Sequence, residues 1–269
     1  MKYAILADIH SNYQALKSVI ADIKSKKVDK IICAGDIITK GVNSRKCIDL
    51  VKESCDIVLQ GNVDFRHSQN PEDFKDNPLE CNRIKFNQSL MTKDDIDYLL
   101  SLPLCTEFKL AEKLVRVFHA HPESNFKTIN NYNTSFKEKF ELFKPSQYTE
   151  SQEIADIVVY GHIHYQYLEK IYHRTIINCG SVGSPGMLVF DENINCPADE
   201  IRQAHYVILE DKDNNISITF ESVDYDIQKE LEDNSINPEK EAYFDEILNA
   251  KYRCIDKLKK SLEDKGYKF

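Results

Sequence analysis

Seven side chains able to bind metals or move protons each follow a short apolar run of the sequence. They are Asp8, His10, Asp36, Asn62, His119, His162 and His164. Carboxylate and amide oxygens bind hard divalent ions, and imidazole nitrogens bind borderline transition metals, so this mixture favours Mn, Fe, Zn or Ni over Ca or Mg. Two such ions about 3.5–4 Å apart can share one carboxylate and a hydroxide whose pKa is lowered to near neutrality. We therefore expect a centre of two divalent metal ions, with Mn the first choice.

The apolar runs before these residues have the length and composition of buried strands. Residues 3–7, 31–34 and 57–59 form the first three runs, and apolar positions between 13 and 23 recur at helical spacing. This alternation predicts successive βαβ units. Open α/β sheets bind ligands at the carboxyl ends of their strands, which is where the polar clusters fall. Three separate segments thus deliver polar groups to one edge.

The rest of the chain is predicted to form mostly strands. Single strands are expected at 114–118, 157–160, 167–171 and 175–179, and a closing hairpin at 204–210 and 216–223. A helix is expected over 92–102, where Thr92 begins the pattern and Asp95 stands at the position of its capping partner.

The length and the pattern together predict one catalytic domain with additions. At 269 residues the chain is long enough for one well-buried core. We assign residues 1–225 to this domain, with irregular insertions at about 122–152 and 185–203, and residues 226–269 to a C-terminal helical extension. One helical face of the extension carries Phe244, Leu248, Ile255, Leu258 and Leu262. This face is expected to dock on the domain or on a second subunit, and the latter would give a homo-oligomer.

The composition is that of an ordinary folded protein, with 42% hydrophobic and 29% charged residues. A net charge of -9 argues against broad binding to nucleic-acid backbones. The opening MKYAILADIH lacks the features of a secretory signal, and no apolar run approaches membrane-spanning length, so no membrane partner is expected. The eight cysteines form no C-x-x-C pair, which favours a reducing, cytoplasmic setting.

Five motifs in a fixed order carry a resemblance to a known family. They are D-x-H at Asp8, G-D at Asp36, G-N-x-D at Asn62, a lone histidine at His119, and G-H-x-H at His162 followed by N-x-G-S-V-G. This set resembles the calcineurin-like metallophosphoesterase superfamily, and it is most similar to the small YfcE-like branch. The resemblance covers residues 1 to about 225. It implies an α/β fold, a four-layer αββα sandwich with a dinuclear metal site at the carboxyl ends of the strands.

The resemblance also implies a role for each site residue. The implied ligands are Asp8, His10 and His164 for the first metal, Asn62, His119 and His162 for the second, and Asp36 for both. Asn62 would also contact the substrate phosphate. We expect Asp36, Asn62 and His119 to act most directly in catalysis, in which a metal-bridging hydroxide hydrolyses a phosphate ester.

One position departs from the family pattern in a way that bears on the substrate. Many relatives have a histidine directly after the asparagine, where it protonates the leaving oxygen, but this chain has Val63. Water must then serve as the acid, or the leaving group must already be a good one. This weakens the case for alkyl monoesters. We expect a phosphodiesterase acting on a small, for example nucleotide-like, phosphoester.

Two other functions stay open on the sequence alone. One is a phosphoprotein phosphatase of the same superfamily, which differs in substrate rather than in chemistry. The other is a non-catalytic, metal-binding interaction scaffold. Such scaffolds tend to lose the ligand set that this chain keeps.

Several further residues have a structural interpretation beside a functional one. His67 and His121 lie near motif residues and could reach the phosphate, although solvated loop positions are favoured. Asn12 either orients the metal site or caps the helix that starts near Tyr13, and the cap is favoured. The aromatic residues of the first insertion either stack on a nucleobase or pack the insertion onto its own domain, and packing is favoured. They are Phe126, Tyr132, Phe136, Phe140, Phe143 and Tyr148.

Overall fold

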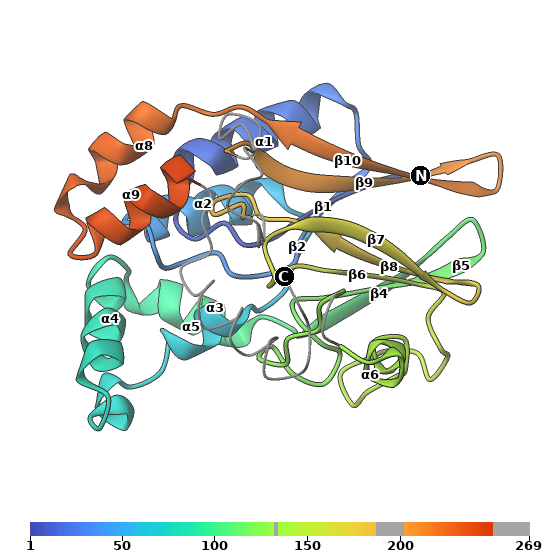
Figure 1. Ribbon diagram of the computed structural model, residues 1–269, viewed down its shortest axis with the longest axis horizontal. Coiled ribbons are helices and arrows are strands. Elements are labelled where there is room, and N and C mark those ends of the chain that lie inside the picture. Colours follow the sequence, from blue (N-terminus) through green and yellow to red (C-terminus); the bar gives the residue numbers. More distant parts are fainter. Residues whose placement is uncertain (132–133, 187–201, 250–269) are drawn as a thin grey trace, which may run out of the picture.

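Two packed β-sheets form the centre of the molecule (Figure 1). The computed structural model describes residues 1–131, 134–186 and 202–249. Within them, the first sheet consists, in spatial order, of β10 (Asn215–Val223), β9 (Ala204–Lys212), β1 (Lys2–Leu6), β2 (Lys30–Cys33) and β3 (Ile57–Val58). Strands β1, β2 and β3 run parallel, and β9 is antiparallel to both β1 and β10. The sheet thus combines a parallel half, built from βαβ units, with an antiparallel hairpin at its edge.

The second sheet also combines parallel and antiparallel strands. Its strands, in spatial order, are β4 (Cys105–Leu110), β5 (Lys113–Phe118), β6 (Ile157–Tyr160), β8 (Arg174–Cys179) and β7 (Gln166–Ile171). Strands β5, β6 and β8 are parallel, whereas β4 and β7 pair antiparallel at the two edges. The carboxyl ends of β5 and β6 therefore meet at one edge of the sheet.

Helices lie outside both sheets (Figure 1). The α-helices are α1 (Tyr13–Ser25), α2 (Ser44–Ser54), α3 (Asn62–Arg66), α4 (Pro78–Ser89), α5 (Lys93–Ser101), α6 (Phe136–Glu141), α8 (Ile227–Asp233) and α9 (Lys240–Asn249). Short 3-10 helices occur at Pro71–Phe74 and Asn234–Ile236. Helices α1 and α2 pack on the outer face of the first sheet, and the α6 region packs on the outer face of the second. The result is the four-layer αββα sandwich that the family resemblance implies.

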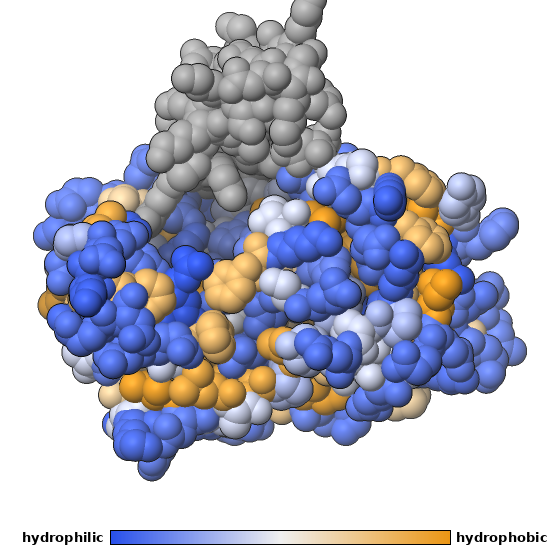
Figure 2. Space-filling model, turned by 90° about the horizontal axis from the view of Figure 1, so that it is seen from below, coloured by the Kyte–Doolittle hydropathy of each residue, from blue (hydrophilic) through white to orange (hydrophobic). Residues whose placement is uncertain are grey.

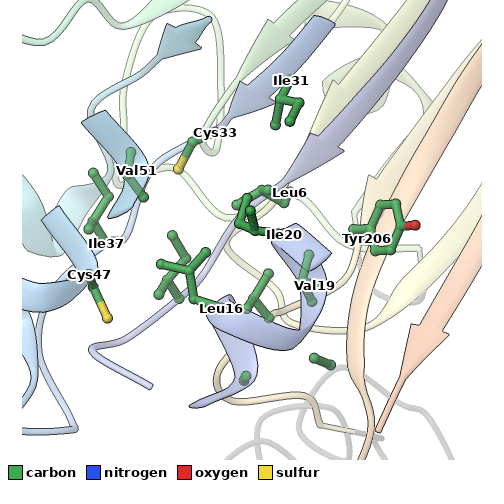
Figure 3. Close-up of a cluster of buried hydrophobic side chains, with 14 of the residues drawn as sticks. Leu6, Leu16, Val19, Ile20, Ile31, Cys33, Ile37, Cys47, Val51 and Tyr206 are labelled. Carbon is green, nitrogen blue, oxygen red and sulfur yellow. The ribbon is translucent and has the colours of Figure 1, made fainter. Parts of the chain in front are cut away.

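Alternation along the strands divides the core into layers. In β1, Ala4 and Leu6 face the helices, whereas Tyr3 and Ile5 face the second sheet. Figure 3 shows the helix-side cluster, in which side chains from α1 and α2 meet Leu6 and other strand residues. Because successive strand side chains point to opposite faces, apolar residues on both faces require a cover on both sides. The parallel strands have near-continuous apolar runs because helices cover one of their faces and the other sheet covers the opposite face.

Most sequence-based predictions of elements are confirmed. The predicted strands form, including the hairpin of β9 and β10. Helix α5 begins with the expected capping box of Thr92 and Asp95. Asn12 caps α1, because its side chain accepts a hydrogen bond from the backbone N–H of Ala15. Its side-chain amide also donates to the Gly183 carbonyl at 3.1 Å, so it ties α1 to a loop of the second sheet.

Two predictions about the additions need correction or fall outside the described residues. The first insertion is not wholly irregular, because Ser135 and Glu138 form a capping box that starts α6. In α9 the buried face carries Tyr243, Glu246 and Ile247, whereas Phe244 is only half-buried. Most of the insertion predicted at 185–203, and the extension beyond residue 249, lie outside the described residues.

Figure 2 shows the molecule of Figure 1 from below. This face is mainly hydrophilic, and apolar side chains are exposed on it in small groups. Among the described residues, no helix combines the length and the apolar character needed to cross a membrane.

Helix α8 packs on α1 through a buried carboxylate. Glu230 of α8 is completely buried. Its side chain accepts hydrogen bonds from the backbone N–H of Gln14 at 3.3 Å, from Asn234 at 2.7 Å and from the Tyr243 hydroxyl at 3.0 Å. Burial raises the pKa of Glu230 from its ordinary value of 4.5 to about 7. The Glu230 carboxyl group, which is protonated below about pH 7, thus joins α8 to α1.

This carboxyl group predicts a pH dependence of stability. Its pKa is higher in the folded than in the unfolded state, so its contribution is fully present below about pH 4.5 and is lost as pH rises through about 7. Between these values the free energy of unfolding should fall by up to about 3 kcal/mol relative to Glu230→Gln, which stays neutral. Urea unfolding of both proteins from pH 5 to 8 measures this difference. If the free energies of unfolding of wild type and Glu230→Gln changed equally with pH, the raised pKa of Glu230 would be contradicted.

Candidate metal centre

The seven predicted site residues lie at strand ends that converge from both sheets. Asp8 and His10 follow β1, Asp36 follows β2, and Asn62 begins α3 after β3. His119 follows β5, and His162 and His164 follow β6. The side chains fall into two groups: Asp8, His10 and His164 in one, and Asp36, His119 and His162 in the other. Within each group the potential ligand atoms lie within 4.8 Å of one another.

The first group is compact and almost completely buried. The Nε2 atoms of His10 and His164 are 3.1 Å apart. Asp8 Oδ1 lies 3.5 Å from His164 Nε2 and 4.0 Å from His10 Nε2. Two nitrogens and one oxygen therefore point at one small volume, which is the donor set that a borderline transition metal accepts.

The second group includes Asn62 as a fourth member. Asp36 Oδ1 lies 3.3 Å from His119 Nε2. The Asn62 side-chain amide lies 2.9 Å from both His119 Nε2 and His162 Nδ1. The other carboxylate oxygen of Asp36 is 3.8 Å from His10 Nε2 in the first group. Asp36 thus lies between the two groups, and its two oxygens face different ones.

Hydrogen bonds to the outer ring nitrogens fix the orientation of the histidines. The Nδ1 atom of His119 donates to the Ala34 carbonyl at 2.9 Å, and that of His164 donates to the Ser184 carbonyl at 2.7 Å. An N–H committed to a carbonyl leaves the opposite ring nitrogen as the lone-pair donor, so both residues present Nε2 to the centre. The Thr128 hydroxyl lies 2.9 Å from His162 Nε2, which leaves Nδ1 of that ring facing inward.

The loops that carry Asp36 and Asn62 are held by backbone hydrogen bonds to the Asp64 side chain. Its side chain accepts from the N–H groups of Asp36 at 2.8 Å, Ile37 at 2.9 Å and Gly61 at 2.9 Å. A side chain at Gly61 would meet the Asp36 backbone nitrogen at 2.1 Å, so only glycine permits this approach. The last residue of the G-N-x-D motif therefore joins the β2 and β3 loops. No role was assigned to Asp64 from the sequence, although its place in the motif was a usable signal.

Unusual backbone conformations are concentrated at the site. Five of the seven residues have a positive φ, between 50° and 68°: Asp8, His10, Asp36, His162 and His164. Residues other than glycine rarely adopt this left-handed region, and each instance costs on the order of 1–3 kcal/mol. Such conformations persist only where the surrounding structure imposes them, and they cluster at functional sites.

The electrostatics of the site favour a cation at its centre. Burial raises the pKa of Asp8 to about 8, and it lowers the pKa of His162 to about 4 and that of His164 to about 3. Burial also acts to raise the pKa of Asp36, but the neighbouring histidines, His119 above all, hold it well below its usual range. Burial acts to lower the pKa of His119, but the Asp36 carboxylate outweighs this and raises it to about 9. At pH 7 His162 and His164 are therefore neutral, which is the form of imidazole that binds a metal, whereas metal binding would displace a proton from Asp8 and from His119.

The residues present fit two divalent metal ions. Asp8 Oδ1 is buried and has no hydrogen-bond partner among the described residues, although its neighbour Oδ2 accepts from the His162 N–H at 2.8 Å. A buried carboxylate oxygen without a partner is costly, and a metal ion would supply the missing interaction. The orphaned oxygen belongs to the group that also contains His10 and His164.

The C-terminal extension also reaches the surroundings of the first group. Lys40, in the loop after β2, donates to Ser184 at 2.8 Å, and both side chains hydrogen-bond Glu246 of α9. The carbonyl of Ser184 is the acceptor that orients His164. No local pattern in the sequence indicates this contact, because it joins residues that are far apart along the chain.

Three other sequence interpretations can now be compared with the structure. His67 and His121 are buried rather than solvated, with exposed fractions of 6% and 2%, so that interpretation was wrong. The turn after β8 approaches the site closely, because the Gly183 N–H donates to the Asp8 carbonyl at 2.9 Å. A Cβ at Gly183 would lie 1.7 Å from the Ile9 carbonyl oxygen. Phe143 is buried in the domain core, which agrees with packing of the first insertion.

A four-layer sandwich with two groups of metal-ligand residues at converging strand ends defines a metallophosphoesterase fold. The chain belongs to the calcineurin-like phosphoesterase superfamily, whose domain model matches residues 1–193. Phosphoester hydrolysis is the general activity of that superfamily.

Individual proteins are similar to this chain over most of its length. The chain is 29% identical over 244 residues to the uncharacterized protein MJ0912 of Methanocaldococcus jannaschii, covering 85% of this chain and 90% of that one. A metallophosphoesterase from Sphaerobacter thermophilus has a similar structure, with a TM-score of 0.69, 22% identity, and coverage of 93% of this chain and 100% of that one. The hypothetical protein PH1004 from Pyrococcus horikoshii OT3 has a TM-score of 0.72 and 14% identity, covering 93% and 98% of the two chains. Both structures share the fold.

Proposed function

We propose that this protein hydrolyses a phosphodiester with two divalent metal ions, of which Mn is the first choice. The observation that supports this most directly is the position of Asp36 between two groups of ligand atoms. Its Oδ1 lies 3.3 Å from His119 Nε2 and its Oδ2 lies 3.8 Å from His10 Nε2. A carboxylate in this position suits the bridging of two ions about 3.5–4 Å apart.

The side chains around the centre would bind and orient the phosphate. Metal ions, when bound, supply positive charge for the phosphate oxygens and acidify a water molecule. Asn62 contacts both histidines of the second group, so its amide is placed to hold a phosphate oxygen. The hydrogen bonds to Thr128, Ala34 and Ser184 keep the histidines in fixed orientations, which reduces reorganisation during the reaction.

The residues near Asn62 indicate which leaving groups are suitable. Val63 cannot donate a proton. His67, one helical turn further, is buried, and burial lowers its pKa to about 4, so it is neutral at pH 7 and a poor proton donor. A substrate whose leaving group departs without protonation suits this site best. This reasoning supports a diester with a stabilised leaving group over an alkyl monoester.

Hydrolysis by metal-stripped protein, with Mn, Ni, Zn or Mg added back separately, tests the proposal. The substrates are bis(nitrophenyl) phosphate and nitrophenyl phosphate, which release the same chromophore. We expect turnover only with added metal, faster with Mn than with Mg, and faster for the diester than for the monoester. No turnover of either ester with any of these metals would refute the proposed function. A clear preference for the monoester would refute its diesterase part.

A reducing, cytoplasmic location is part of the same proposal. The six cysteines in the described part of the chain are free thiols, and five of them are buried. Free thiols of this kind persist in compartments where thiols stay reduced.

A further inference from the structure

Two partly exposed aromatic rings lie edge to face beside the metal-ligand residues. Phe65 and Phe126 have exposed fractions of 40% and 42%, and their ring centroids are 6.2 Å apart with an interplanar angle of 80°. The rings come from different segments, α3 and the loop that follows β5. Two large apolar side chains brought together from separate segments at the surface form a local apolar contact area.

Both rings are attached to segments that carry or support residues of the second ligand group. Phe65 lies three residues after Asn62 in α3, so the two side chains are neighbours on one helix face, about 5–6 Å apart at their Cβ atoms. Phe126 lies two residues before Thr128, whose hydroxyl contacts His162. The aromatic pair therefore borders the side of the centre formed by Asn62 and His162.

A guanidinium group adds a flat, cationic surface to the pair. The Cζ atom of Arg66 lies 5.0 Å from the centroid of the Phe126 ring. Its nearest described carboxylate, that of Glu80, is 3.7 Å from Nη1, and the Arg66 side chain keeps 42% of its surface exposed. Arg66 thus presents a positive charge and a planar group next to two aromatic rings, and this combination suits stacking with a planar ligand.

Arg66 also forms a wall of a groove that begins next to the metal-ligand residues. The groove has a volume of about 650 Å³, and its lining includes Val63, Arg66, His67, Arg83, Phe86 and Asn87. Sites of this size accommodate small organic molecules. His67 Nδ1 and Asn87 Oδ1 are buried and have no hydrogen-bond partner among the described residues. The groove adjoins the aromatic pair through Arg66, which both lines the groove and lies over the Phe126 ring.

We propose that Phe65, Phe126 and Arg66 form a subsite for the nucleobase of a nucleotide-type phosphoester. This substrate class rests on the proposed function, because the phosphate would lie at the metal centre. A nucleobase matches the flat aromatic and guanidinium surfaces, whereas a long alkyl chain would need a longer apolar wall than two rings provide. Base–aromatic stacking contributes about 1–3 kcal/mol per base, so the subsite would have a measurable effect on affinity.

The chain offers a matched control at a second exposed aromatic pair. Phe136 and Tyr172 lie edge to face with centroids 5.3 Å apart, and their exposed fractions are 52% and 77%. Tyr172 occupies the turn between β7 and β8, at the opposite end of the second sheet from His119 and His162. Phe136→Ala thus removes a similar exposed ring far from the centre.

Calorimetric binding to the Mn-supplemented full chain tests the subsite without requiring turnover. The probes are adenosine monophosphate and ribose phosphate, which differ only in the base. We expect the nucleotide to bind wild type about tenfold more tightly than ribose phosphate. Phe65→Ala and Phe126→Ala should each remove most of this difference and leave ribose phosphate binding unchanged, whereas Phe136→Ala should change neither. Equal binding of the two probes by wild type, or an undiminished difference in both site variants, would overturn the subsite.

A kinetic comparison separates failure of the subsite from failure of the proposed hydrolysis. The nitrophenyl ester of thymidine monophosphate and methyl nitrophenyl phosphate share a leaving group, and we expect a KM about tenfold lower for the thymidine ester. Base-dependent binding without hydrolysis of either ester would support the subsite and refute the hydrolysis. Hydrolysis with the same KM for both esters, unchanged by Phe65→Ala, would refute the subsite and support the hydrolysis.

Discussion

Asp36→Asn should lower kcat/KM for the nitrophenyl diester at least about 1000-fold, equal to about 4 kcal/mol of transition-state stabilisation. Asp36 is buried between the two ligand groups, and its carboxylate faces a histidine of each. The substitution keeps the size of the side chain and an oxygen able to accept from the Val63 N–H, which now donates to Asp36 Oδ1 at 3.0 Å. It removes the negative charge that two cations would share. Initial rates in saturating Mn measure the effect.

A matched control separates this effect from a general loss of charge. Asp94→Asn removes an exposed carboxylate in the first turn of α5 and should leave the rate within about twofold of wild type. Thermal unfolding followed by circular dichroism checks that D36N is folded. A folded D36N protein with metal-stimulated turnover close to that of wild type would show that Asp36 does not bridge two ions.

Arg116→Met should destabilise the protein by about 3–5 kcal/mol, because it leaves the buried Glu107 carboxylate without its cation. Arg116 is completely buried in β5. Its Nε and Nη2 atoms lie 2.7 and 2.6 Å from Glu107 Oε1. Its remaining N–H groups donate to three carbonyls, those of Phe143, Lys144 and Glu153, at 2.6, 2.7 and 3.0 Å. All five donors are used, so the guanidinium fastens the end of the first insertion to the second sheet.

Urea unfolding of three variants measures this contribution. Arg116→Met combined with Glu107→Gln should recover part of the lost stability, because the double variant no longer buries an unpaired charge. Lys93→Met breaks an ion pair whose lysine side chain is 84% exposed, and should change the stability by less than about 0.5 kcal/mol. A similar small effect for Arg116→Met would contradict the structural role of the buried pair.

The parts of the fold that the sequence predicts are those encoded by local patterns. The apolar run before Asp8 specifies a strand buried on both faces. Thr92 and Asp95, three residues apart in the sequence, specify the start of a helix because they hydrogen-bond to each other. The order of the motifs places the seven site residues at strand ends, and the structure brings them together in space.

The parts that the sequence did not reveal depend on contacts between distant residues. The positive φ angles at Asp8 and His162 are imposed by the surrounding loops, and neither residue type requires them. The link from Glu246 to Ser184 spans 62 positions and has no periodic signature. His121 looks like a loop residue because Pro122 and a polar run follow it in the sequence, yet its ring contacts Lys127 of the insertion and only 2% of its surface is exposed. Tertiary packing rather than local pattern decides such positions.

The same distinction applies to the aromatic residues of the first insertion. Their spacing alone did not distinguish packing from ligand binding. Phe143 is buried against the second sheet, Phe136 pairs with Tyr172, and Phe126 reaches the surroundings of the metal-ligand residues. The conformation of the loop after β5 determines where Phe126 lies, since it places the Phe126 ring against that of Phe65.

Metal stoichiometry tests the central claim most directly. Metal-stripped wild type, His162→Ala and His164→Ala are saturated with Mn, freed of unbound ion and analysed for metal per chain. Each histidine belongs to a different ligand group, so we predict two ions for wild type and about one for each variant. Two tightly bound ions in both variants, or no more than one ion in wild type, would contradict a two-metal centre built from these residues.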